Sequence, residues 1–176
     1  MKDRPILKIR VVLALFLAAL VLSGLTAFPI ETGLRWLASV LPDAEQQPPS
    51  ALTAWILEVR DAVIDTNARY PFLAYGTDWL AFAHLVIAVA FIGPLRDPVR
   101  NMWVVDFGLI ACAGVIPMAL IAGHVRGIPL WWRLIDCSFG VFGVIPLLMV
   151  RKWIRALATP PAMGPPPTLD PSPAGP

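Results

Sequence analysis

Four long apolar runs constrain this chain more than any other feature of its sequence. They cover residues 9–28, 76–94, 102–122 and 130–150. Each is near the length of about 20 residues that a helix needs to cross a hydrocarbon core. None shows the alternation of period two that marks a membrane β-barrel. With 57% hydrophobic and 15% charged residues, the chain is also too apolar for an ordinary soluble domain. We therefore predict an all-α, polytopic membrane protein with four transmembrane helices.

The two ends of the chain differ in character. Residues 1–10 are charged and precede an apolar run, as in a signal peptide, but that run is longer than the apolar part of such peptides and lacks a good small-residue cleavage site. We expect an uncleaved first helix. Residues 159–176 hold eight prolines and almost no charge, which predicts a disordered tail. Residues 1–158 are thus expected to form one transmembrane domain.

The lysines and arginines are distributed unevenly between the two sides of the predicted bundle. Nine of the 14 lie in residues 1–10 at the start of the first run, follow the fourth, or lie between the second and third. By the positive-inside rule, this bias predicts that both termini and the tail are cytoplasmic. Tryptophans prefer the headgroup level, and five of them fall at predicted span ends: Trp79, Trp103, Trp131, Trp132 and Trp153.

The segment 29–75 is the sizeable part outside the spans. Apolar residues recur at a mostly helical spacing in two places, around Trp36 and around Trp55. This predicts two short amphipathic helices in an extracytoplasmic loop, with Ser50 as the amino-terminal cap of the second. Their apolar faces are expected to lie either on the outer leaflet or on the bundle.

Structural roles are expected for several polar and small residues. In GPLRDPVRN, residues 93–101, we predict a tight turn in which Asp97 caps the third span. Asp106 is expected to pair with Arg100 or Arg151. Small residues predict close packing of the third and fourth spans; they are Gly108, Ala111, Cys112 and Gly114 on one, and Ser138, Gly140 and Gly143 on the other.

The strongest candidate site is a group of ionisable residues near the outer end of the bundle, where charge inside a bilayer is costly unless partnered. At 1.5 Å per residue, His84 and Asp136 would both lie roughly 8 to 10 Å deep and could meet. Arg133 shares the helix face of Asp136, where it could pair with it or extend to the headgroups. The full cluster is Asp78, His84, His124, Arg126, Arg133 and Asp136. The alternative is a charge network that only ties helix ends together.

Cofactor chemistry has weaker support. Two histidines on neighbouring helices can hold a haem iron, but by helical rise His84 lies about 9 Å deeper than His124. Cys112 and Cys137 lie at different depths, and we interpret them as buried small residues rather than a disulfide. No metal site is predicted, and neither haem nor quinone is expected. The net charge of +2 gives no reason to expect a nucleic-acid partner.

The segments TDWLAFAHLVIAVAFIGPLRDPVRN and RGIPLWWRLIDCSFGVFGVIPL resemble a family of uncharacterised small four-helix bacterial inner-membrane proteins. The resemblance covers roughly residues 77–148. It implies the location and the number of helices and carries over no activity.

The leading functional hypothesis is a noncatalytic accessory or subunit protein of the bacterial inner membrane. It would bind a partner, a second copy of itself or a lipid through its outer loop and hairpin. One alternative is a membrane redox or lipid-modifying enzyme that uses His84 and Asp136, with quinone or haem. A small transporter is the other, although no inverted repeat is visible in the sequence.

Overall fold

The protein was analysed as a computed structural model that describes residues 3–46 and 48–158. Within these residues the chain is helical and contains no strand. The elements in order are α1 (Asp3–Ala27), α2 (Ile30–Val40), α3 (Ala51–Arg69), the 3₁₀ turn η1 (Pro71–Ala74), α4 (Tyr75–Ala90), α5 (Ile92–Arg96), α6 (Met102–Pro117), the π-helical turn η2 (Met118–Ala122), α7 (Gly123–Val125) and α8 (Leu130–Ala158). The predicted proline-rich tail, 159–176, lies outside the described residues.

Four segments are long and apolar enough to cross a membrane: Pro5–Ala27, Pro71–Arg96, Met102–Val125 and Leu130–Ala158. The predicted all-α polytopic fold with four spans is therefore confirmed. The first and last helices are longer than the apolar runs alone indicated. α1 begins six residues before Ile9, and α8 continues eight residues beyond Val150.

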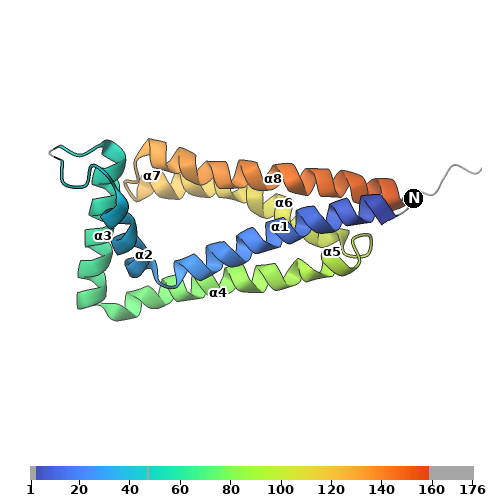
Figure 1. Ribbon diagram of the computed structural model, residues 1–176, viewed down its shortest axis with the longest axis horizontal. Helices are drawn as coiled ribbons and strands as arrows, with labels where there is room; N and C mark the ends of the chain where they lie inside the picture. The colour runs from blue at the N-terminus through green and yellow to red at the C-terminus, as the bar shows by residue number, and fades with distance from the viewer. Residues whose placement is uncertain (1–2, 47, 159–176) are drawn as a thin grey trace, which may run out of the picture.

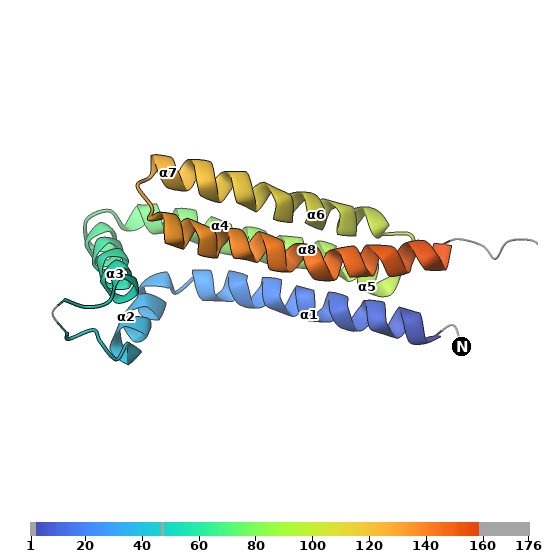
Figure 2. The same ribbon diagram turned by 90° about the horizontal axis from the view of Figure 1, so that it is seen from above.

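The four spans form two helical hairpins arranged as a wedge. α1 packs along α4, and α6 packs along α8. The two pairs converge at the end that carries α5 and the start of α1, and they separate toward the opposite end, where α3 lies across the bundle (Figure 1). The view from above shows α6 along one side and α1 along the other, with α8 and α4 between them and α2 and α3 beyond their ends (Figure 2).

The buried core lies at the narrow end of the wedge. Its members come from α1, the α4–α5 junction, α6 and α8, and are Ile9, Leu13, Phe91, Val104, Val105, Leu147, Val150 and Ile154. The Phe91 ring packs on Phe16 with a centroid distance of 5.0 Å. Lipid tails are as apolar as these side chains, so close packing rather than removal from water holds the helices together. Ile154 explains why α8 continues past Val150, since it completes this core.

Close helix contacts within each hairpin depend on glycine. A Cβ atom on Gly140 would lie 2.5 Å from the carbonyl oxygen of Cys112, and one on Gly143 would lie 2.7 Å from the Cys112 sulfur. In the other hairpin, a Cβ on Gly24 would lie 3.0 Å from both the Ala81 carbonyl oxygen and the His84 Cβ. The predicted close packing of the third and fourth spans is confirmed here, but Gly114 faces open space.

The turn between the second and third spans differs from the prediction. Asp97 does not cap α6, because that helix begins at Met102, after Asn101. Instead Asp97 Oδ1 accepts a hydrogen bond from the backbone N–H of Arg100, at 3.0 Å, and so closes the turn itself. The stretch from Gly93 to Arg96, expected to be a turn, belongs to the short helix α5.

Charged residues fasten the narrow end of the bundle. Arg10 donates from Nε to the carbonyl oxygen of Leu95 at 3.0 Å and from Nη2 to that of Arg96 at 3.3 Å. A cation is favourable there because the last carbonyls of α5 lack helical partners. Arg151 pairs with Asp106 at 2.5 Å, which is one of the two pairings expected for that aspartate.

Candidate functional site

The wide end of the wedge carries a folded unit made of α2, the connecting segment and α3. We call residues 30–69 the cap. Asp43 lies in the segment that connects α2 to α3, and its carboxylate binds the start of α3. Its Oδ1 accepts from the Thr53 hydroxyl at 2.5 Å, and its Oδ2 accepts from the Ser50 backbone N–H at 2.9 Å. Ser50 Oγ accepts from the Thr53 N–H at 3.3 Å, so the predicted cap of α3 is confirmed. These bonds lower the pKa of Asp43 to about 2, the Thr53 hydrogen bond contributing most.

A second polar contact joins α2 to α3. Glu31 Oε2 accepts from the amide of Asn67 at 2.8 Å, and its Oε1 accepts from Arg35 at 2.9 Å and 3.0 Å. The Asn67 hydrogen bond, followed by that of Arg35, lowers the pKa of Glu31. The two helices of the cap are therefore joined at both ends, by Asp43 on one side and by Glu31 on the other.

The apolar sides of α2 and α3 turn toward each other and toward the bundle. Ala38 of α2 and Ile56 of α3 are buried. A shallow cavity of about 280 Å³ lies where α2, α3 and the start of α4 meet, with Ile30, Val63 and Leu73 in its lining. These faces therefore pack partly within the protein, while Trp36 of α2 and Leu52 of α3 remain exposed.

The cap also contacts the tip of the α6–α8 hairpin. The Trp55 ring of α3 lies 6.4 Å from that of Trp132, near the start of α8, at an angle of 54°. Trp132 in turn packs edge-on against Trp131, at 5.7 Å. Because α3 also continues through η1 into α4, it bridges the two hairpins where they are farthest apart (Figure 1).

The six predicted site residues do not join into one network. His84 lies on α4 and packs against Gly24 of α1, and its Nδ1 lies 2.8 Å from the Leu80 carbonyl oxygen. Asp136 lies on α8, in the other hairpin. Among the residues that the structure describes, none makes a hydrogen bond or ion pair with the side-chain carboxylate of Asp136 or of Asp78. The expected contact between His84 and Asp136 is therefore absent.

Arg133 points toward the hairpin tip rather than along its own helix. Its Nη1 donates to the carbonyl oxygen of Leu120 at 3.2 Å, in the turn η2. Its stem lies against Gly123, where a Cβ would come within 2.6 Å of the arginine Cδ. The expected pair with Asp136 does not form, because the absence of a side chain at Gly123 opens a path to α6 instead.

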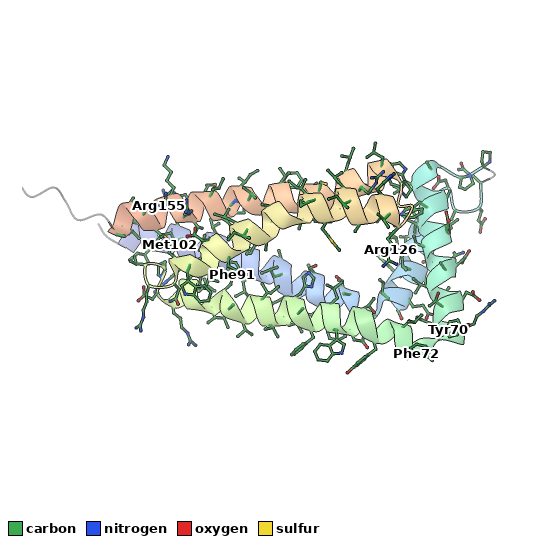
Figure 3. The ribbon with its side chains drawn as sticks, turned by 180° about the vertical axis from the view of Figure 1, so that it is seen from behind. Tyr70, Phe72, Phe91, Met102, Arg126 and Arg155 are labelled. Carbon is green, nitrogen blue, oxygen red and sulfur yellow. The ribbon has the colours of Figure 1, made fainter. Side chains whose placement is uncertain are left out.

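The other two predicted site residues lie at the exposed tip of the same hairpin. Both His124 and Arg126 are exposed, and Figure 3 shows Arg126 beside the cap. Gly127 makes the turn between them and α8 with a φ of +72°, a conformation that favours glycine. Two arginines and a histidine thus lie at this tip, since Arg133 reaches it from α8.

The residues considered for cofactors are dispersed. His84 and His124 belong to different hairpins, and the Nδ1 of His84 is engaged with its own helix. No group of three or more His, Cys, Asp or Glu in residues 3–46 and 48–158 is arranged to hold a metal ion. Cys112 and Cys137 are both free thiols. Cys112 contacts Gly143 and serves helix packing, as its interpretation as a small residue predicted.

Sequence reasoning missed the polar residues that build the cap. Asp43 and Glu31 belong to no motif, and their partners lie 10 and 36 residues away along the chain. The sequence did place Asp43 seven residues before Ser50, the predicted capping residue, and that spacing could have indicated a contact between them. Comparison with known proteins adds nothing to this assignment, since no protein-family model, curated protein or solved structure matches the chain.

Proposed function

We propose that this chain is a noncatalytic accessory protein of the bacterial inner membrane, and that its cap binds a partner membrane protein. The observation that carries the proposal is the use of polar side chains in the cap. Asp43, Glu31 and Asn67 are all engaged in holding α2 on α3. They build a fixed surface and do not converge on a substrate-sized polar cavity, as a reaction centre would require.

The outward side of the cap offers two kinds of contact. On α2, Trp36 is 66% exposed and Val40 is 53% exposed, and they lie one helical turn apart. On α3, the acidic residues Glu58, Asp61 and Asp65 are exposed. Exposed tryptophan on a rigid surface is typical of protein interfaces. Asp61 and Asp65 pair with Arg60 and Arg69, so the flanking face is charged but largely balanced.

The orientation belongs to the same proposal. The start of α1, α5 and the end of α8 lie together at the narrow end, and the cap lies at the other (Figure 1). The narrow end also carries the majority of the lysines and arginines. The positive-inside rule therefore supports a cytoplasmic narrow end and an extracytoplasmic cap.

Site-specific photocrosslinking in cells tests the proposal. A photoreactive phenylalanine analogue would replace Trp36 or Val40, on the cap, or Ile110, which is 72% exposed on α6 and faces away from the core. We expect a discrete protein adduct from the two cap positions and none from Ile110. Adducts of equal yield at all three positions, or none at the cap, would contradict a cap-specific partner.

A further inference from the structure

We propose that Arg133, with Arg126 on the same hairpin tip, binds the phosphate of an anionic phospholipid in the leaflet at the cap end of the bundle. The inference is independent of the partner proposed for the cap. The Arg133 guanidinium is held in place by contacts with η2 and α7, and no described carboxylate balances its charge.

Within residues 3–46 and 48–158, no carboxylate pairs with Arg133. Arg35, Arg60, Arg69 and Arg151 each pair with a carboxylate. For Arg133, the described residues supply only the Leu120 carbonyl oxygen, and Asp136, one turn further along α8, makes no ion pair. At the membrane boundary such a guanidinium is available to an anionic lipid headgroup.

The geometry leaves one edge of the guanidinium available. Nη1 is engaged with Leu120 and Nε is buried without a partner, so these two atoms face the protein. Nη2 is neither hydrogen-bonded within the described residues nor buried. The stem lies against Gly123, which restricts its movement. An arginine held in this way has already lost most of its side-chain freedom, which favours binding.

The position along the helix identifies the anion. Trp131 and Trp132 directly precede Arg133, and tryptophan rings prefer the headgroup level of a bilayer. The guanidinium edge therefore lies at the level of the lipid phosphates. Arg126 and His124 are exposed on the same tip, and no described carboxylate pairs with either. A phosphate bound at Arg133 would therefore lie on a tip that carries a second exposed arginine, and a net negative headgroup would balance positive charge there.

Native mass spectrometry of the full chain, delipidated in mild detergent and titrated with phosphatidylglycerol, tests the assignment. We expect Arg133→Gln to weaken the apparent affinity about tenfold, since hydrogen bonds to charged groups contribute on that scale. Arg126→Gln should weaken it about fivefold, as loss of one surface cation would. Arg69→Gln, which removes a cation of the cap already paired with Asp65, should leave it unchanged.

One further variant and one competition experiment complete the test. Arg133→Lys, which retains the charge without the planar guanidinium, should bind the lipid with intermediate affinity. If Arg133→Gln does not fold, the affinities of Arg133→Lys and Arg126→Gln are compared with wild type instead. Inorganic phosphate at millimolar concentration should not displace the lipid. Equal binding by wild type, Arg133→Gln and Arg133→Lys would overturn the site. Full displacement by inorganic phosphate would overturn the assignment of the anion to a lipid.

Discussion

Gly140 lies so close to Cys112 that a Cβ atom at position 140 would stand 2.5 Å from the Cys112 carbonyl oxygen. The obstacle is backbone, which cannot rotate away as a flexible side chain would. The contact sits midway along α6 and α8, where small residues let the two helices approach. It determines how tightly this hairpin closes.

Gly140→Ala should therefore force α6 and α8 apart and destabilise the bundle by about 1–3 kcal/mol, the usual cost of overpacking. Thermal unfolding in detergent, followed by circular dichroism, measures the change. Gly114→Ala is the matched control on α6, because a Cβ there meets nothing within 4 Å. It should be neutral or slightly stabilising, since alanine favours a helix. Equal effects of the two changes would contradict the close approach at Gly140.

The ion pair between Asp106 and Arg151 should stabilise the narrow end of the bundle. Each side chain is about one-third exposed, so replacing either partner, as in Asp106→Asn or Arg151→Gln, is expected to cost about 1–2 kcal/mol. The double variant should cost less than the sum of the two single changes, by about 1 kcal/mol. Lys152→Gln, an exposed neighbour, serves as control. Strict additivity of the two single changes would show that the pair does not interact.

The cap should lose its closed arrangement only in strong acid. Asp43 has its pKa lowered from 3.8 to about 2. Its stabilising effect is therefore complete above pH 3.8 and disappears as the pH falls through about 2. A fluorine NMR signal from 5-fluorotryptophan at Trp55 should stay constant down to about pH 3 and then shift. Asp43→Asn should abolish that transition, whereas Glu45→Gln should retain it. A transition unchanged in Asp43→Asn would assign it to another group.

Reporter fusions test the proposed orientation. Fusions at residues 45 and 127 should report an extracytoplasmic position, and fusions at residues 97 and 170 a cytoplasmic one, as the bias of lysine and arginine predicts. A fusion at residue 170 that reports an extracytoplasmic position would remove the proposed topology, because an even number of spans requires both ends on one side.

The sequence predicted those parts of the fold that depend on local composition. Four spans follow from apolar length, and the start of α3 follows from Ser50, because capping involves only neighbours along the chain. The end of α8 was predicted eight residues too early, because it depends on contacts between residues distant in sequence. Arg151 and Lys152 interrupt the apolar run, but the helix continues because Ile154 packs in a core formed by residues distant in sequence.

The candidate site was harder to predict, because helical depth alone does not say which helices are neighbours. His84 and Asp136 were expected at similar depth, yet α4 packs on α1 through Gly24, and α8 packs on α6 through Gly140. Arg133 shows a related difficulty. A spacing of three residues favours a pair with Asp136, but Gly123, in another element, offers a different path to the Leu120 carbonyl oxygen.

We expect the cap to be held on the bundle as a fixed surface. The most direct test is crosslinking in native membranes of a chain in which Cys112 and Cys137 are replaced by alanine. Trp55→Cys with Trp132→Cys should be joined rapidly by a short bismaleimide, because these two rings are in contact. Glu58→Cys with Trp132→Cys should react slowly, since Glu58 faces outward. Equal crosslinking rates for the two pairs would mean that the cap moves freely on the bundle and is not a fixed surface.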